Sequence, residues 1–184
     1  MVELIIGLTG LIGSGKTEVS NHLIKNHNFN YISTGDLVRQ ECKKQGLEPN
    51  RKNAQAMQKT MVDEYGADYW TNKVINTIKE KKWKRAIFDG VRYNIDFELP
   101  KKEFGDKFIL VYIKAEKQVR FERIKKRNRI GDPQTIQEFD KQENNELKLF
   151  DFTELFEKVD FTLDNSEDIP HLHNETNALI ELNT

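Results

Sequence analysis

Cysteine is almost absent from the sequence: Cys42 is the one cysteine among 184 residues. A single cysteine cannot form an internal disulfide, so the fold cannot depend on a disulfide framework. Three charged neighbours, Glu41, Lys43 and Lys44, predict that Cys42 lies on a solvated helix face as a free thiol without a functional role.

Long apolar runs and an excess of one charge are absent as well. No apolar run approaches the roughly 20 residues of a membrane helix, and the N-terminus has no charged segment ahead of a long apolar one. The 29 basic residues are balanced by 30 acidic ones, for a net charge of −1. No global field therefore attracts nucleic acid or an anionic membrane. We expect a cytoplasmic protein without a membrane partner, in which any phosphate binding is local.

Strand and helix patterns alternate along the whole chain. The apolar run Leu4–Thr9 leads into a glycine cluster, as a strand buried on both faces does. Further β-prone runs occupy residues 29–33, 86–89, 108–114 and 160–163. The alternation predicts one α/β doubly wound domain, with a mainly parallel five-stranded sheet and helices on both faces.

Two prolines bear on the expected helices. Pro100 predicts that the segment after Arg92 is broken into short pieces, because proline removes a helical hydrogen bond. The pair Asp132-Pro133 is suited to the cap and first turn of a helix that extends toward Leu147.

Residues 10–17 carry the complete pattern G-x-x-x-x-G-K-[ST] between a predicted strand and a predicted helix. Glycines let the backbone curl so that its N–H groups and the first turn of the helix face one anion. Lys16 supplies a mobile positive charge to the β- and γ-phosphates, and the hydroxyl of Thr17 is suited to Mg²⁺. The alternative, a chance glycine-rich turn, fits the flanking strand and helix less well. We expect ATP and Mg²⁺ here, with ATP contacted by Gly10, Gly13, Ser14, Gly15, Lys16 and Thr17.

An acidic residue, Asp89, ends the apolar run 86–89 directly before Gly90. This is the layout of a carboxylate that holds the water shell of Mg²⁺ beside the phosphate loop, so Thr17 and, through water, Asp89 are the candidate metal ligands. The alternative is a turn acid at the end of a strand. Lys16 and Asp89 are both candidate catalytic residues.

The segment S-T-G-D-L-V-R at residues 33–39 resembles the T-G-D-L-L-R segment of adenylate kinases and other nucleoside monophosphate kinases. The resemblance implies that Arg39 holds the phosphate of the acceptor, that Thr34 lies near its base or sugar, and that Asp36 belongs to the same site. The alternative is that Asp36 is a helix cap and Arg39 a surface residue.

The segment A-I-F-D-G-V-R at residues 86–92 resembles the D-G-F-P-R motif of the same kinases, although it is one residue shorter. The resemblance implies that Arg92 is a second contact to the acceptor phosphate. Because of the missing residue, the direction in which Arg92 points stays open.

The segment 117–129 contains four arginines, Arg120, Arg123, Arg127 and Arg129. At about 100° per residue the first three fall within a sector of roughly 60° on one helix face. The segment resembles the start of the lid in these kinases, which implies that Arg123 and Arg127 neutralise charge in the transition state. The alternative is that Glu116 and Glu122 pair with the arginines on a solvated helix.

Together these motifs resemble the P-loop kinase group of nucleoside monophosphate kinases and dephospho-CoA kinases, in its little-characterised adenylate-kinase-like branch. The resemblance implies one domain over residues 1–184, with a helical acceptor-binding insert at about 35–82 and a lid at about 120–140. One departure is that relatives carry an arginine in the helix after the lid, whereas this chain has only lysines there, Lys141 and Lys148 among them.

The implied activity is transfer of the γ-phosphoryl group of ATP·Mg²⁺ to a small phosphate-bearing acceptor. The segment 34–37, T-G-D-L, is the nucleotide-kinase form, which favours a nucleoside or deoxynucleoside monophosphate over dephospho-CoA. A different class of function stays open: a nucleotide-dependent regulator or nucleic-acid-associated ATPase that uses the basic segments 79–85 and 120–129. The balanced charge disfavours nucleic acid, and the sequence leaves the acceptor's identity and the oligomeric state open.

Overall fold

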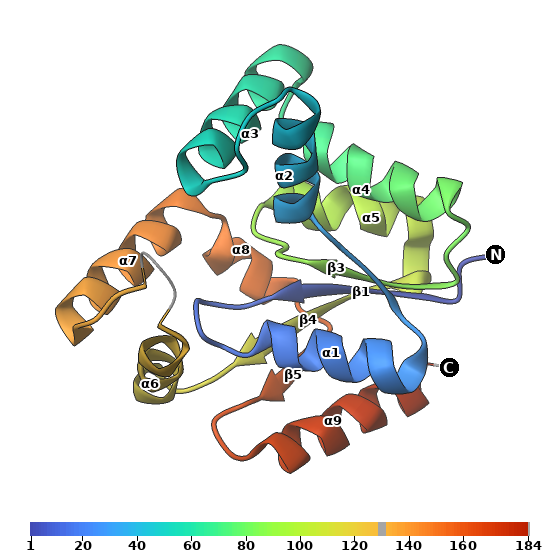
Figure 1. Ribbon diagram of the computed structural model, residues 1–184. Coiled ribbons are helices and arrows are strands. Elements are labelled where there is room, and N and C mark those ends of the chain that lie inside the picture. The colour runs from blue at the N-terminus through green and yellow to red at the C-terminus, as the bar shows by residue number, and fades with distance from the viewer. Residues whose placement is uncertain (129–131, 184) are drawn as a thin grey trace.

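A sheet of five parallel strands with helices on both faces organises residues 1–128 and 132–183, which the computed structural model describes (Figure 1). The elements follow in the order β1 (Leu4–Thr9), α1 (Lys16–His27), β2 (Asn30–Ser33), α2 (Thr34–Lys44), α3 (Arg51–Tyr65), α4 (Tyr69–Glu80), β3 (Arg85–Asp89), α5 (Asn94–Phe104), η1 (Gly105–Lys107), β4 (Phe108–Lys114), α6 (Lys117–Arg127), α7 (Ile136–Leu149), α8 (Phe152–Glu157), β5 (Phe161–Asp164) and α9 (Ile169–Leu182). Within this part of the chain no helix is both long and apolar enough to cross a membrane.

The strand order is β2-β3-β1-β4-β5, and each neighbouring pair is parallel. All six residues of β1 are buried, because helices cover both faces of this central strand. Ile5 joins the core formed with α2, α3, α4 and α8, whereas Ile6 joins the core formed with α1 and α9. Figure 1 shows the two helical layers on opposite sides of the sheet. The predicted α/β doubly wound fold is therefore confirmed.

The carboxyl ends of the strands bring the predicted functional segments to one edge of the sheet. Leu8 of β1 pairs with Asp89 of β3, so the loop that follows β1 lies beside the end of β3. The helices α6 and α7 lie beyond the same edge (Figure 1). Ligands of open parallel sheets bind at this edge.

Cys42 is completely buried, which corrects the expectation of a solvated position. One turn before it, Val38 points to the same face of α2, and both side chains belong to the core shared with α3 and α4. The charged residues next to Cys42 in the sequence lie on other faces of the helix, so they do not report its environment.

Pro100 lies inside the continuous helix α5, so the expected break does not occur. The start of the helix is anchored by Asp96, whose carboxylate accepts hydrogen bonds from the backbone N–H groups of Arg92 and Tyr93 at 3.1 Å each. The hydroxyl of Thr71 in α4 donates to the same carboxylate at 2.6 Å. Pro100 itself is buried, and only one turn of helix follows it. Packing and the anchored first turn outweigh the lost hydrogen bond.

The helix α7 begins at Ile136, later than Asp132-Pro133 predicts. Thr135 is its N-cap and accepts a hydrogen bond from the backbone N–H of Glu138, whose carboxylate accepts one from the backbone N–H of Thr135. These two bonds form a capping box, whereas the carboxylate of Asp132 bonds Arg127.

Candidate active site

The loop between β1 and α1 curls around the side chain of Lys16. Its ammonium group donates hydrogen bonds to the carbonyl oxygens of Gly10 at 2.6 Å and Leu11 at 3.3 Å. Gly13 has a φ of 78°, and a Cβ atom there would lie 2.7 Å from the carbonyl oxygen of Arg120. Glycine is therefore required by both backbone conformation and space at this point of the predicted phosphate loop.

Burial lowers the pKa of Lys16 to about 8, because a charged ammonium loses hydration in this partly enclosed position. The negative charges of Asp89 and Glu146 act in the opposite direction, whereas Arg92 and Arg120 lower the pKa further. Four charged side chains from β3, α6, α7 and the turn after β3 thus lie within electrostatic range of Lys16. An anionic ligand would add the negative charge that stabilises the ammonium.

The phosphate loop is supported by Asn165, which follows β5. Its amide group donates to the carbonyl oxygen of Ser14 at 2.8 Å, and its side-chain oxygen accepts from Arg123 at 3.2 Å. A Cβ atom on Gly15 would lie only 1.9 Å from the Asn165 amide nitrogen. Asn165 therefore packs directly against the loop and links it to α6.

Arg120 supports the other side of the loop. Its guanidinium group donates to the carbonyl oxygen of Ile12 at 3.2 Å and to that of Ala115 at 3.0 Å, and it forms an ion pair with Glu143 of α7. Both charged side chains of the pair are buried. Arg120 consequently connects the phosphate loop to the helix after the lid segment.

The two carboxylate oxygens of Asp89 have different environments. Its Oδ2 atom accepts a hydrogen bond from the phenol of Tyr31 at 2.7 Å. Its Oδ1 atom is buried and has no hydrogen-bond partner among the described residues. A buried polar atom without a partner is costly, so this oxygen fits a role toward an ion or its water shell. Thr17, the other predicted metal ligand, lies in the first turn of α1, and the binding of Mg²⁺ by this pair stays a prediction.

The phenol that holds Asp89 stays protonated. Burial, and then the negative charge of Asp89, raise the pKa of Tyr31 above its ordinary value. Tyr31 is therefore a permanent hydrogen-bond donor to Oδ2, and the sequence reading did not single it out.

The arginines of α6 have separate partners. Arg123 contacts Asn165, and Arg127 forms two hydrogen bonds to the carboxylate of Asp132, at 2.9 and 2.6 Å. Neither Glu116 nor Glu122 pairs with an arginine among the described residues, so the expected solvated pairing is not formed. Arg129 and part of the predicted lid lie outside the described residues.

The segment that resembles the nucleotide-kinase motif begins α2. Ser33 is the N-cap, and its hydroxyl accepts from the backbone N–H of Asp36 at 3.0 Å and donates to the Asp36 carboxylate at 2.8 Å. Arg39 forms an ion pair with Asp36 at 2.6 Å. Partial burial opposes the charged form of Asp36, but the hydrogen bonds from Arg39 and Ser33 lower its pKa. The Thr34 hydroxyl is buried and has no partner among the described residues.

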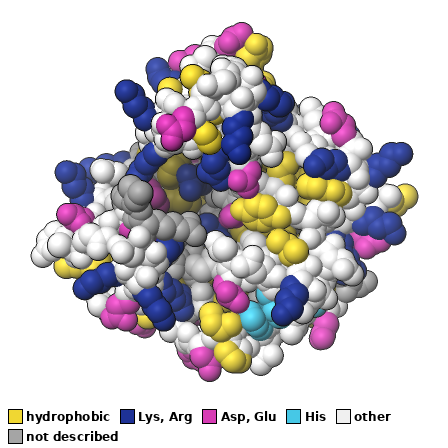
Figure 2. Space-filling model, in the orientation of Figure 1, with side chains coloured by type: hydrophobic (Ala, Val, Ile, Leu, Met, Phe, Trp, Pro, Cys, Tyr) yellow, Lys and Arg dark blue, Asp and Glu magenta, His cyan; other side chains and the backbone are white. Residues whose placement is uncertain are grey.

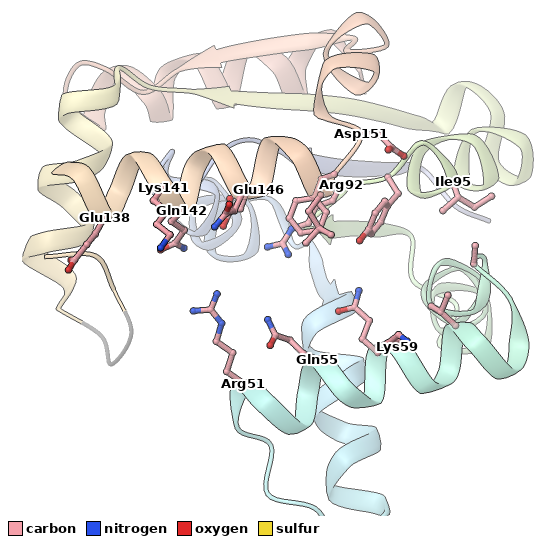
Figure 3. A pocket seen from close by; sticks show the side chains of 17 residues that line it. Arg51, Gln55, Lys59, Arg92, Ile95, Glu138, Lys141, Gln142, Glu146 and Asp151 are labelled. Atoms are coloured by element: carbon pink, nitrogen blue, oxygen red, sulfur yellow. The ribbon is translucent and has the colours of Figure 1, made fainter. Parts of the chain in front are cut away.

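A cleft of about 1170 Å³ lies between α3 and α7, with Arg92 in its wall (Figure 3). Arg92 stacks on the ring of Phe150, with 4.9 Å between the guanidinium carbon and the ring centroid. The backbone N–H of Asp151 donates to the carbonyl oxygen of Arg92 at 3.0 Å, so the segment after α7 is joined to the turn after β3. Figure 2 shows a recess in the surface between α3 and α7, with Lys and Arg side chains in it.

Arg39 and Arg92 line different cavities. Arg39 lines a smaller cavity of about 280 Å³, which shares Arg51, Gln55 and Gln58 with the large cleft. The grip of one phosphate by both arginines therefore stays a prediction, as do the roles of Thr34 and Asp36.

The sequence did not lead us to Asn165 or Arg51, although a sequence feature marks each of them. Asn165 follows the last strand, and polar residues at the carboxyl ends of parallel strands meet at one edge. Arg51 lies in the first turn of α3, which contains no acidic residue, although that turn favours acids over cations.

Comparisons with known proteins agree with this arrangement. The family model described as "AAA domain" matches residues 9–140. The UPF0200 protein of Methanosarcina acetivorans is 30% identical over 176 residues, which cover 96% of this chain and 93% of that protein. Among solved structures, TT1252 from Thermus thermophilus has a TM-score of 0.67 at 16% identity over 100% of both chains. Shikimate kinase from Bacteroides thetaiotaomicron has a TM-score of 0.60 at 16% identity over 97% of both chains. At these identities the structural likeness concerns the fold.

The parallel sheet, the glycine-rich loop around Lys16 and these similarities define a protein with the P-loop kinase fold. The chain belongs to the family described as "AAA domain" and to the UPF0200 proteins.

The lowered pKa of Lys16 predicts that nucleotide affinity depends on pH. The ammonium form binds phosphates, so above about pH 8 the free protein must take up a proton to bind. We expect the affinity for ADP to fall by up to about 10-fold per pH unit above that value. Titration of ADP between about pH 7.5 and 9.5 measures this, since the phosphates of ADP stay ionised over that range. Lys16→Ala is the control, with weaker and pH-independent binding, and an equal slope in both proteins would contradict the role of Lys16.

The contact between Tyr31 and Asp89 predicts an effect on metal dependence. Tyr31→Phe removes the donor to Oδ2, so the carboxylate is no longer held in one orientation. We expect the Mg²⁺ concentration that half-maximally promotes ADP binding to rise by about 10-fold. Tyr65→Phe, which alters an exposed tyrosine of α3, is the matched control and should leave the titration unchanged. Asp89→Asn should raise this Mg²⁺ concentration more than Tyr31→Phe does. The opposite order would refute the assignment of Asp89 as the metal-binding carboxylate.

Proposed function

We propose that this protein is a phosphotransferase that moves the γ-phosphoryl group of ATP·Mg²⁺ to a small phosphate-bearing acceptor, first among them a nucleoside or deoxynucleoside monophosphate. One observation carries the proposal. Arg92 and Glu146, which line the large cleft, are also electrostatic neighbours of Lys16 in the phosphate loop. A ligand in the cleft would thus lie beside the phosphates of a nucleotide bound at the loop.

The proposed reaction is a direct in-line transfer. An oxygen of the acceptor phosphate attacks the γ-phosphorus, the bond from that phosphorus to the bridging oxygen breaks, and ADP leaves. Lys16 stabilises negative charge on the transferring group, and Arg123 and Arg127 are proposed to do so from the lid side. Thr17 directly, and Asp89 through water, would hold Mg²⁺, which would neutralise further negative charge when bound.

For Arg127 this role requires a change of partner. Its guanidinium group is occupied by both oxygens of Asp132 in the described structure. An incoming phosphate would compete with that carboxylate for the same donors, and a phosphate dianion is the stronger competitor.

The fold alone does not determine which acceptor the protein phosphorylates. One fold neighbour is a shikimate kinase by name, so the same fold is not restricted to nucleotide acceptors. The proposal of a phosphate rests on the motif residues Arg39 and Arg92 and on the basic lining of the cleft. Dephospho-CoA, which accepts the phosphoryl group at a hydroxyl, is the second candidate acceptor.

A nucleic-acid-associated ATPase is the candidate of a different class. It would need free cations on the segments 79–85 and 120–129, but several of these are paired with acids. Lys79 bonds Glu103, and Lys84 and Arg85 bond Glu3. The pairing reduces the attraction that these segments offer to a phosphate backbone, which favours the kinase.

A coupled assay of ADP release tests the proposed function. Each ribo- and deoxynucleoside monophosphate and dephospho-CoA is offered with ATP·Mg²⁺, and the phosphorylated product is identified by mass. We expect turnover with one acceptor class, and a loss of most of it in Lys16→Ala. Turnover of ATP that no acceptor stimulates, together with salt-dependent binding of RNA or DNA, would point instead to the ATPase.

The two acceptor arginines predict a selective kinetic effect. Arg39→Ala and Arg92→Ala should each lower acceptor kcat/KM by about 10- to 100-fold, since a charge-assisted contact to phosphate is worth about 1.5 to 3 kcal/mol. ATP affinity should change little. In a double-mutant cycle the two losses should be non-additive if both residues hold one phosphate. Additive losses, or equal effects on ATP, would show that the arginines do not share the acceptor.

A further inference from the structure

The large cleft holds more positive charge than its own carboxylates neutralise. Four cationic side chains line it, Arg51, Lys59, Arg92 and Lys141. Lys59 is paired with Asp63 at 3.4 Å, whereas the other three form no ion pair or side-chain hydrogen bond with any described residue. Unpaired cations gathered in a concave site indicate an anionic ligand.

The acids of the cleft form no ion pair with these three cations, and two of them hold backbone groups instead. The carboxylate of Glu138 caps α7, and that of Asp151 accepts the backbone N–H of Asn94 at 3.0 Å. Glu146 is the remaining carboxylate of the lining, and its side chain forms no ion pair or hydrogen bond with a described residue. The lining therefore carries four cations and three carboxylates, a formal excess of one positive charge, and three of its cations have no ion pair that a ligand would need to break.

Arg51 has a special place among these cations because it lines both cavities. It shares the smaller one with Arg39 and the larger one with Arg92. Figure 3 shows Arg51 extending from α3 toward α7, where Lys141 extends from the other side. Arg51 is therefore the cation that connects the two predicted acceptor arginines.

Apart from Arg92, the other arginines near the site are already engaged. Arg39 is held by Asp36, Arg120 by Glu143 and Arg127 by Asp132. Arg51 needs no such pair to be broken before it binds a ligand. Its position in the first turn of α3, where the helix dipole disfavours a cation, is a local cost that an anionic ligand would offset.

We infer that Arg51, opposite Lys141 and together with Arg92, binds the acceptor anion and makes the cleft selective for a phosphate monoester dianion over a carboxylate. The inference rests on the proposed function, because the cleft is taken as the acceptor site. A guanidinium group forms two parallel hydrogen bonds to phosphate oxygens, and two such groups with an ammonium match a dianion better than a monoanion.

Binding of simple anions tests the inference without relying on turnover. The phosphate loop is first saturated with ADP, so that added anions report on the cleft. Methyl phosphate and acetate are then titrated at constant ionic strength, and binding is followed by NMR shifts of the backbone amides. We expect the intact protein to bind methyl phosphate at least about 10-fold more tightly than acetate.

Arg51→Gln should weaken methyl phosphate binding by about 10-fold or more and leave ADP affinity unchanged. Lys52→Gln is the matched control, because Lys52 is the next residue of the same turn, is exposed and lines neither cavity. It should change the affinity by less than about twofold. Arg51→Lys, which keeps the charge without the fork of donors, should fall between the two. Spectra of each variant establish that α3 remains folded.

Equal effects of Arg51→Gln and Lys52→Gln, or equal affinities for methyl phosphate and acetate, would overturn the inference. The proposed reaction can fail separately. If no acceptor is phosphorylated but the affinity for methyl phosphate still depends on Arg51, the anion site is supported and the proposed reaction is wrong. If transfer occurs and Arg51→Gln keeps the acceptor KM of the intact protein, the reaction stands and this assignment is wrong.

Discussion

The position of the phosphate loop depends on side chains that come from the second half of the chain. Asn165 holds the carbonyl group of Ser14, and Arg120 holds that of Ile12. The same Arg120 pairs with Glu143 inside the protein, so α7 takes its place relative to the loop through one buried ion pair. The wall of the cleft that α7 provides is thereby set by the contact that supports the nucleotide loop.

This arrangement explains why one helix, α6, can serve both structure and chemistry. Three of its arginines have different tasks: Arg120 is buried beneath the loop, Arg123 bonds Asn165, and Arg127 faces Asp132 at the end of the lid segment. Removing the partner of a buried arginine costs about 3 to 5 kcal/mol, whereas an exposed pair contributes about 1 kcal/mol or less. Only the more exposed arginines are therefore free to exchange partners when a ligand binds.

The fold and the phosphate loop were predictable because their signals are local. An apolar run before a glycine cluster predicts β1, and the spacing of Gly10, Gly15 and Lys16 predicts the curled loop. Helical spacing placed Arg120, Arg123 and Arg127 on one helix face but could not predict their partners. Glu143 lies on another helix, and Asn165 follows a strand about forty residues away. Contacts between distant segments depend on how the elements pack, which periodicity does not encode.

The expectations that failed concern places where two local signals competed. Asp132 and Thr135 are both good helix caps, and the pairing of Asp132 with Arg127 left the capping to Thr135. At Cys42, charged neighbours suggested exposure, whereas the helical spacing from Val38 placed the thiol in the core. At Asp132 a side-chain contact five residues away along the chain, and at Cys42 the packing of α2 on α3 and α4, separate the observed structure from the expected one.

Because Cys42 is completely buried, its reaction with a thiol reagent reports on local opening of the fold. A thiol reagent reaches Cys42 only when α2 separates from α3 and α4, because these helices share the core around it. The labelling rate under native conditions thus measures the free energy needed to open the helical region that contributes Arg39 and Arg51. Any ligand that bridges this region to α7 slows the labelling in proportion to its occupancy, whatever its chemical identity.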